Sequence, residues 1–237
     1  MLTVAVFAVA FLYSCVGHAG ASGYIAAMTL FGLAPAVVKP TALTLNILVA
    51  AIASWQFRRA GHFSWKLFWP LAIASIPCAF LGGYLNLPLR VFKIAVGLVL
   101  LISAARFLLA PPAESPAKPP ALKTSLGAGA GLGLLSGLTG TGGGIFLTPL
   151  GIYLGWGGTK TIAAVSAAFI LVNSASGLIG HVLKTKSFPA VVPSLAAAAV
   201  AGGIAGAYLG SSRLPHTAIK RLLAVVLLIA GFKLIFA

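Results

Sequence analysis

The stretch GLTGTGGGIFLTP, residues 137–149, places five glycines and two threonines immediately before an apolar run. It resembles a phosphate-binding loop, but a Walker motif requires a Lys directly after its last Gly, and here Ile145 follows Gly144. The dinucleotide fingerprint requires an acidic residue about 20 positions later, and the single acidic residue of the chain is Glu114. The stretch therefore does not predict nucleotide binding.

The composition of the chain decides its class. Of 237 residues, 60% are hydrophobic and 7% are charged, whereas soluble domains carry about 25% charged residues. This composition predicts an all-α polytopic membrane protein. The 16 Lys and Arg residues fall singly or in pairs between apolar runs, which indicates anchoring of helix ends rather than a nucleic-acid-binding face. Cys15 and Cys78 lie within apolar segments, so we expect no metal site, and no cofactor is predicted.

The apolar segments divide into two similar series. The first occupies about 2–16, 21–38, 41–57, 66–86 and 90–110, and the second about 124–138, 143–157, 160–183, 188–210 and 214–236. We therefore predict a first membrane repeat at 1–110, a Pro-rich linker at 111–123 and a second membrane repeat at 124–237. Cleavage of the first segment as a signal peptide is disfavoured, because no Lys or Arg precedes it.

An internal repeat is visible at an offset near 120. GHAGASGYI (17–25) aligns with GLTGTGGGI (137–145), which pairs His18 with Leu138 and Ser22 with Gly142. A short helix pair that returns to its own side, followed by three crossings, gives each half an odd number of passes. The sequence therefore predicts two inverted repeats, each with a Gly-broken pair of short helices followed by three transmembrane helices. Such repeats are typical of transporters that bind substrate where helices are broken near the midplane.

The glycine stretches have two interpretations, a substrate site or close helix packing. Irregular backbone at membrane depth is tolerated where it is buried in protein or lines a watery cavity, and a helix N-terminus favours an anion. Three consecutive glycines favour the site. The candidate substrate-binding residues are Gly17, His18, Gly20, Ser22 and Gly23 at the first break, Thr139, Gly140, Thr141, Gly142, Gly143 and Gly144 at the second, and Thr44, Asn46, Ser166 and Asn173 in the helices that follow.

The remaining ionisable residues bear on ion coupling. His18 is a candidate proton relay, since an ionisable residue within the membrane is a functional hypothesis by default. Lys39 and Lys160 are expected to extend to the membrane interface, as are three histidines near segment ends: His62, His181 and His216. With no acid in a spanning segment, a coupling proton would use His18, hydroxyls and water, or a weakly acidic substrate. Sodium held by oxygen atoms is an open alternative.

The glycine-rich stretch 137–149 ends in Pro149, and a weaker copy of it lies near the N-terminus of this basic chain with many apolar segments. In these features the chain resembles the sulfite exporter TauE/SafE family over residues 5–236. This resemblance implies a secondary transporter in the bacterial inner membrane. It would carry sulfite, a sulfonate or a related organic anion, driven by an ion gradient. An enzyme is not expected, because paired carboxylates and a metal cluster are missing from the sequence. An anion channel and a non-transporting scaffold subunit are the alternatives, and the oligomeric state is left open.

The distribution of Lys and Arg predicts the orientation. If each short pair returns to its own side, ten of these residues collect on one face and six on the other. The face with more positive residues is expected to be cytoplasmic. Both termini should then lie outside and the linker inside.

Overall fold

A computed structural model describes residues 1–85, 90–109, 117–186 and 193–236 of the chain. Glu114 and the first part of the predicted linker lie outside the described residues. The described elements are α1 (Leu2–Cys15), α2 (Ala21–Leu30), α3 (Pro35–Arg59), α4 (Trp65–Tyr84), α5 (Arg90–Leu109), α6 (Leu122–Thr139), α7 (Gly144–Tyr153), α8 (Thr159–Thr185), α9 (Pro193–Tyr208), the π-helix η1 (Leu209–Arg213) and α10 (His216–Phe236). The predicted all-α class is confirmed.

Among the described residues, four helical spans are long and apolar enough to cross a bilayer: Ala36–Arg59, Trp65–Tyr84, Thr159–Thr185 and Pro193–Arg213. Leu2–Cys15, Ala21–Leu30 and Gly144–Tyr153 are apolar but shorter, as expected for the helices on either side of the two breaks. A full crossing needs about 20 residues. Short helices buried among longer ones therefore end inside the membrane.

The predicted boundary between the second and third segments was wrong. The sequence placed it at Pro40, but α2 ends at Leu30 and α3 begins at Pro35. The chain turns at Gly32, whose φ is +76°, a conformation that glycine adopts readily. Pro35 then occupies the first turn of α3, where its missing N–H costs nothing. Pro40 lies within α3.

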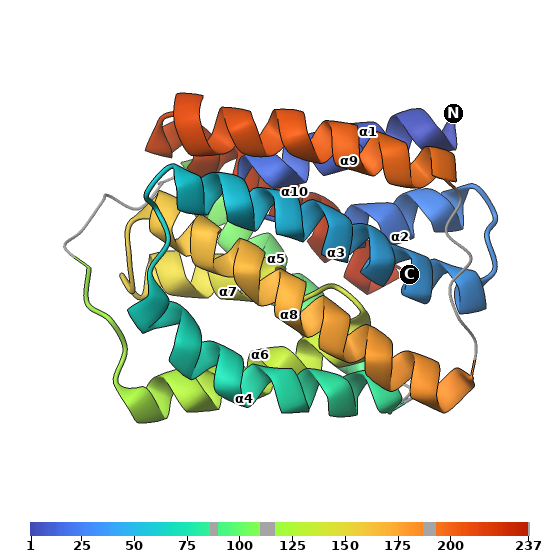
Figure 1. The fold of residues 1–237 in the computed structure, drawn as a ribbon, viewed down its shortest axis with the longest axis horizontal. Helices are drawn as coiled ribbons and strands as arrows, with labels where there is room; N and C mark the ends of the chain where they lie inside the picture. The colour runs from blue at the N-terminus through green and yellow to red at the C-terminus, as the bar shows by residue number, and fades with distance from the viewer. Residues whose placement is uncertain (86–89, 110–116, 187–192, 237) are drawn as a thin grey trace.

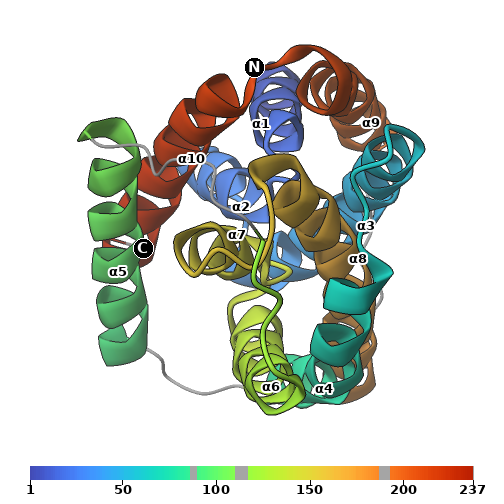
Figure 2. The same ribbon diagram turned by 90° about the vertical axis from the view of Figure 1, so that its left-hand side faces the viewer.

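The two halves enter the bundle from opposite ends. Both chain termini lie at one end, to the right in Figure 1, where α1 begins and to which α2 returns. At the opposite end α6 begins and α7 returns. Seen along the bundle, α2, α7 and α8 lie in the middle, and α5 with α10 lies at one side (Figure 2). This arrangement supports the inverted repeats, which remain a prediction.

Contacts between helices also follow the division into halves. α4 packs against α6 and α8, while its counterpart α9 packs against α1 and α3. α3 packs against α8, and α5 against α10. If each helix is replaced by its counterpart in the other half, the same set of helix contacts results. A two-fold relation between the repeats would produce this symmetry.

The register of the repeat differs from the sequence alignment. α2 and α7 each have ten residues, Ala21–Leu30 and Gly144–Tyr153, so their offset is 123. At this offset Gly17 and Gly20 correspond to Gly140 and Gly143, and all four have positive φ. On the predicted repeat, this register pairs His18 with Thr141 rather than with Leu138. The sequence alignment matched glycines by identity, whereas the fold matches them by backbone conformation.

Two stripes of glycine bring helices into backbone contact. A Cβ at Gly129, Gly133 or Gly137 of α6 would collide with the α4 carbonyls of Leu71, Ser75 and Ala79. In the other half, a Cβ at Gly202, Gly206 or Gly210 would collide with the α1 carbonyls of Phe7, Phe11 and Cys15. Both stripes have the four-residue spacing of close membrane packing. Gly137 thus belongs to a packing stripe.

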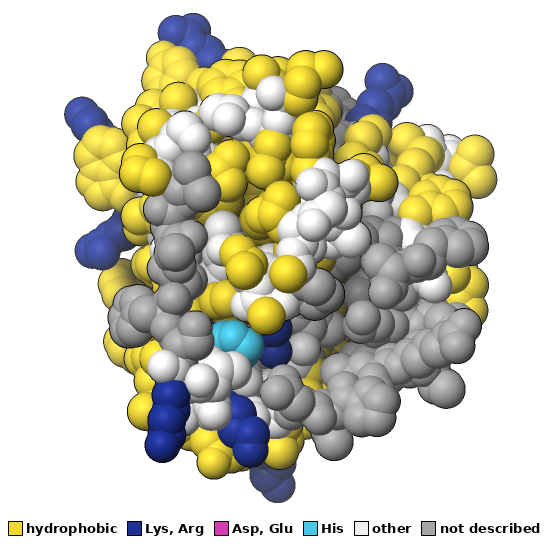
Figure 3. Space-filling model, turned by 90° about the vertical axis from the view of Figure 1, so that its right-hand side faces the viewer, with side chains coloured by type: hydrophobic (Ala, Val, Ile, Leu, Met, Phe, Trp, Pro, Cys, Tyr) yellow, Lys and Arg dark blue, Asp and Glu magenta, His cyan; other side chains and the backbone are white. Residues whose placement is uncertain are grey.

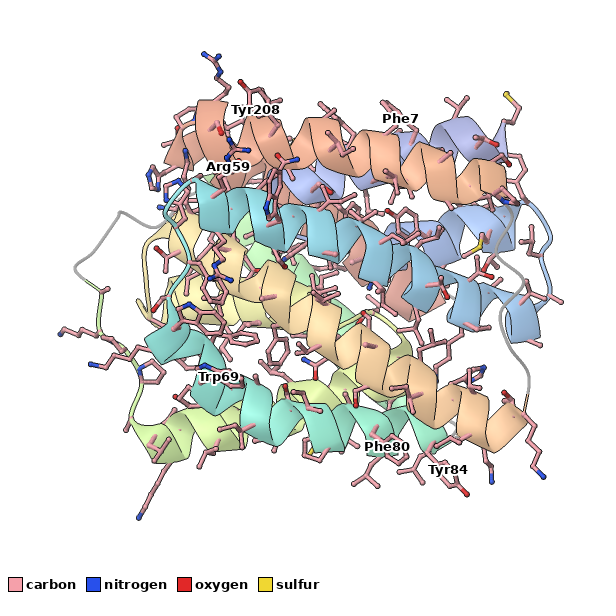
Figure 4. All side chains as sticks on the ribbon, in the orientation of Figure 1. Phe7, Arg59, Trp69, Phe80, Tyr84 and Tyr208 are labelled. Carbon is pink, nitrogen blue, oxygen red and sulfur yellow. The ribbon has the colours of Figure 1, made fainter. Side chains whose placement is uncertain are left out.

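Aromatic and basic side chains mark the two ends of the bundle. Figure 4 shows Arg59, Trp69 and Tyr208 at one end and Phe80 and Tyr84 at the other. At the first end the Arg58 and Arg59 guanidinium groups lie 5.2 and 5.3 Å from the ring centroids of Trp65 and Trp55, and at the second end the Lys184 ammonium lies 5.1 Å from that of Tyr84. Such belts form at membrane–water interfaces.

The orientation can be tested by cysteine labelling. After replacing Cys15 and Cys78 with serine, Lys118→Cys should react with a membrane-impermeant maleimide only in opened cells. Lys186→Cys should react in intact cells, because both lysines are exposed and the positive-rich end should be cytoplasmic. The opposite result would reverse the orientation. Labelling of both from one side would overturn the inverted arrangement.

Candidate functional site

The two helix breaks are built from glycines in a left-handed conformation. In the first break φ is +73° at Gly17 and +102° at Gly20, and in the second it is +71° at Gly140, +79° at Gly142 and +81° at Gly143. Gly20 and Gly143 directly precede α2 and α7. The first amides of a helix have no intrahelical acceptor, so each break points a partial positive charge into the protein.

His18, in the first break, is hydrogen-bonded to the helix that follows the second break. Its Nε2 lies 2.7 Å from Oγ1 of Thr148 in α7, and Thr148 Oγ1 donates to Ser166 Oγ in α8 at 2.7 Å. All three residues are buried, with 2% of His18 exposed. The backbone of Gly144 lies near the ring, but Nδ1 makes no hydrogen bond of normal geometry within the protein.

This hydrogen-bond chain fixes the proton on the His18 ring. Thr148 gives its one hydroxyl proton to Ser166, so Nε2 of His18 must donate to Thr148. In the neutral ring, Nδ1 then carries a lone pair and acts only as an acceptor. A protonated ring would instead present an N–H at Nδ1. Only that protonated form can donate a hydrogen bond to an anion.

A second polar cluster surrounds the second break. Asn46 of α3 donates from Nδ2 to the carbonyl of Thr141 and to Ser174 Oγ of α8, each at 3.3 Å. A Cβ at Gly142 would lie 2.9 Å from this same Nδ2, so only glycine admits the amide there. Asn46 is fully buried and its Oδ1 has no hydrogen-bond partner within the protein.

Ile170 of α8 lies between the two clusters. A Cβ at Gly142 would approach Ile170 Cγ2 at 2.7 Å, and a Cβ at Gly144 would approach its Cγ1 at 2.6 Å. Ser166 and Ser174, the α8 members of the clusters, are eight residues apart, or about 12 Å along a helix. The site thus consists of two polar half-sites with an apolar side chain between them.

Comparison with known proteins identifies the family of the chain. A family model described as sulfite exporter TauE/SafE matches residues 2–234. The chain belongs to the TauE/SafE family. It is 40% identical over 240 residues to the "Probable membrane transporter protein y4hK" of Sinorhizobium fredii, and the match covers 99% of this chain and 97% of that protein. No solved structure matches the chain. The predicted family is confirmed, and the protein is a multi-pass membrane transporter.

The hydrogen bonds of Ser22, Thr44 and Asn173 do not reach a half-site of this TauE/SafE protein, whereas Thr139 contacts the second half-site through Thr141. Ser22 Oγ lies 2.9 Å from the Tyr13 hydroxyl. Thr44 and Asn173 donate to carbonyls of their own helices, those of Pro40 and Phe169. Gly23 packs against Val9. Thr139 donates to the Leu135 carbonyl of its own helix and lies 2.8 Å from the Thr141 hydroxyl.

The basic residues of this family member differ from expectation in their contacts. Lys39 donates to the Leu138 carbonyl at 3.4 Å and Lys160 to the Ser211 carbonyl at 3.3 Å. Both are half-buried, so neither simply extends to the interface. His181 was expected at the interface but is only 9% exposed.

His62 follows α3 and lies 3.2 Å from the Ser211 carbonyl. Partial burial lowers the pKa of this imidazole, and the nearby Lys160 and His216 lower it further, while the bond to the Ser211 carbonyl opposes them. His216, the third histidine expected at the interface, is exposed. Lys160 and His216 thus lie near His62 at this end of the transporter.

Sequence reasoning missed Thr148 and Ser174. Thr148 stands in the quoted stretch, directly before Pro149, but it follows the glycines and reads as part of the apolar run. Ser174 lies among other small residues of α8. The one available signal was a hydroxyl inside a spanning segment, which membrane helices also use for packing.

Proposed function

We propose that this TauE/SafE protein is a secondary transporter that moves a small anion, sulfite or a related organosulfur or organic anion, by alternating access around the two glycine breaks. The observation that carries the proposal is the buried His18 at the meeting of both breaks. A buried polar atom normally has a partner, and the unpartnered Nδ1 of His18 is therefore assigned to a ligand.

The chemistry at this half-site favours an oxyanion. The N-terminal amides of α7 supply partial positive charge, and a protonated His18 supplies one N–H at Nδ1. The only acidic residue in the sequence is Glu114, and it belongs to the linker, so no spanning segment carries a carboxylate to stabilise the protonated ring. An anion would do so. Anion and proton then stabilise one another's binding, which couples transport to protons by thermodynamic linkage.

Thr141 and Asn46 form the second half-site of the proposed path. The Asn46 side chain holds the break through the Thr141 carbonyl, and its free Oδ1 is an acceptor for a water molecule or a protonated substrate. Ile170 separates this half-site from His18. In the proposed cycle, movement of α8 relative to the breaks displaces Ile170 and exposes one half-site at a time.

A flux assay with purified protein in liposomes tests the proposal. Sulfite, a small alkyl sulfonate and a carboxylate such as acetate are the probes. A carrier should accelerate uptake of labelled anion when unlabelled anion is trapped inside, because the loaded site returns faster than the empty one. Flux without this acceleration would indicate a channel. The absence of anion-dependent flux for all three probes would contradict the proposed function.

Thr141→Val is expected to weaken binding of the transported anion about threefold to tenfold, the effect of losing one typical hydrogen bond. In the unliganded protein the Thr141 hydroxyl contacts the Thr139 hydroxyl, which itself donates to the Leu135 carbonyl, so Thr141 must turn from Thr139 to bind the anion. Valine keeps the shape of threonine and removes only this one contact, so the melting temperature should fall by no more than one hydrogen bond allows. Thr44→Val is the matched control, because the Thr44 hydroxyl already bonds its own helix. Equal affinities for both variants and the wild type would remove Thr141 from the site.

Gly143→Ala cannot separate binding from packing. A Cβ at Gly143 would lie 2.8 Å from the Phe169 ring, and the residue has φ of +81°. Alanine there would strain the backbone and disturb α8 in either case. Lower stability of this variant is therefore expected whether or not the break binds an anion.

A further inference from the structure

We propose that each end of the α3–α8 pair carries an anion-binding station outside the central half-sites, formed by Lys39 with His181 at one end and by Lys160 with His62 at the other. This inference rests on the proposed transport of an anion. The stations would admit the anion on one face and release it on the other.

The first station, Lys39 with His181, lies next to the second glycine break. Lys39 stands near the start of α3, and its Cγ would lie 3.1 Å from a Cβ at Gly140. His181 lies near the end of α8. Because α8 packs against α3 in the opposite direction, Lys39 and His181 lie at the same end of the two helices. Nδ1 of His181 is buried and has no hydrogen-bond partner within the protein. Figure 3 shows several basic side chains and a histidine on this end of the molecule, and no acidic side chain among its coloured residues.

The second station lies at the opposite end of the same two helices. Lys160 stands at the start of α8, and His62 follows the end of α3. The Lys160 ammonium and the His62 Nε2 both contact one oxygen, the Ser211 carbonyl, at 3.3 and 3.2 Å. The two cationic groups therefore lie close together. Ser211 belongs to the π-helix η1, a conformation that is frequent at functional sites.

Both stations share a composition that an oxyanion fits. Each station has a lysine ammonium group with three N–H donors. In each, the structure shows one donor in a hydrogen bond to a backbone carbonyl, with a nitrogen–oxygen distance of 3.3–3.4 Å. That distance exceeds the usual 2.7–3.2 Å. Glu114 is the single acidic residue of the sequence. No other residue could therefore pair Lys39 or Lys160 with a carboxylate side chain. An arriving anion can replace the weakly held carbonyl.

The two stations are built from the same parts of α3 and α8. α3 and α8 pack against each other and run in opposite directions (Figure 1). Each end thus combines the lysine from the start of one helix with the histidine from the end of the other. A chance surface lysine would not recur with a histidine at both ends, so this repetition favours a shared function in the transport path.

Sided transport of sulfite tests the stations. Lys39→Gln should raise KM about tenfold for sulfite presented at the face of Lys39, as expected for loss of a hydrogen bond to a charged group, with kcat little changed. Lys160→Gln should do the same only for the opposite face. Right-side-out and inside-out vesicles supply the two faces. Lys39→Arg should restore KM to within about threefold, because it keeps the charge.

Exposed lysines at the same ends are matched controls. Lys184→Gln and Lys66→Gln remove a charge near each face and should leave KM nearly unchanged. A KM that rises equally on both faces, or equally in the control variants, would overturn the stations. So would a Lys39→Gln variant with normal KM. Melting temperatures of all variants should agree within a few degrees. If both Lys39→Gln and Lys39→Arg fail to fold, the role of Lys39 is structural and the proposal is wrong for this station.

A lipid phosphate offers the same chemistry as a free oxyanion, and the lipid composition separates the two. The sided KM change should be the same in vesicles of phosphatidylcholine alone and with added phosphatidylglycerol. A change that requires phosphatidylglycerol would assign the stations to lipid and overturn the proposal. If the wild-type protein moves no anion, the proposed function fails and the stations fail with it. If the wild type transports normally and the variants match their controls, only the stations fail.

Discussion

Gly133→Ala is expected to destabilise the transporter by about 1–3 kcal/mol, the cost of overpacking a close-packed interior. The added Cβ would collide with the Ser75 carbonyl and lie 2.6 Å from the Ser75 Cα. Both atoms belong to the backbone of α4, so a side-chain rotation cannot relieve the contact. α4 and α6 must move apart along their whole stripe. The melting temperature of the purified protein in detergent measures this effect.

Gly131→Ala is the matched control on the same helix. A Cβ at Gly131 meets no atom within 4 Å, and alanine is the better helix former, so this variant should be as stable as the wild type or slightly more stable. Gly206→Ala in the second stripe should behave like Gly133→Ala, because its Cβ would meet the Phe11 backbone. Equal melting temperatures for Gly133→Ala and Gly131→Ala would show that the α4–α6 contact is looser than described.

His18→Gln should weaken anion binding about tenfold to a hundredfold, the range for losing a hydrogen bond to a charged group. Glutamine keeps a donor for Thr148 but cannot be protonated. Because only the protonated imidazole donates at Nδ1, and a bound anion favours that form, wild-type transport should rise as the pH falls from about 8 to 5. In the variant this dependence should be nearly flat for the alkyl sulfonate, which stays fully ionised over this range. Initial uptake rates at several pH values provide the measurement.

His216→Gln serves as the control for this pH profile, because His216 is exposed at the end of the bundle. It should retain the wild-type profile. A His18→Gln variant with the wild-type pH dependence would exclude His18 as the proton carrier, and the coupling ion would then have to be sought elsewhere. Thr148→Val should lower transport less, because it leaves a protonatable ring in place.

On the predicted repeat, His18 corresponds to Thr141, so the two breaks differ in chemistry. Both residues lie between the two positive-φ glycines that flank them in each break. The first break can carry a proton on its imidazole, whereas the second offers only a hydroxyl and carbonyls. An inverted repeat with unequal half-sites would bind the anion more strongly on one side of Ile170 than on the other.

The sequence by itself determined the membrane class, the two series of apolar segments, the glycine breaks and the family. These features depend on composition and on residues that are close along the chain. The four-residue spacing of Gly129, Gly133 and Gly137 was also readable, because a helix brings such positions to one face.

Only the tertiary structure decided which groups share a site. His18 meets Thr148 across 130 residues, and Asn46 meets Ser174 across 128, and local periodicity carries no information on such pairs. The register of the repeat likewise depended on backbone conformation at four glycines, which residue identity does not specify. The proposed pairing of Lys39 with His181 likewise follows from the packing of α3 against α8 in the opposite direction, and that packing depends on the whole bundle.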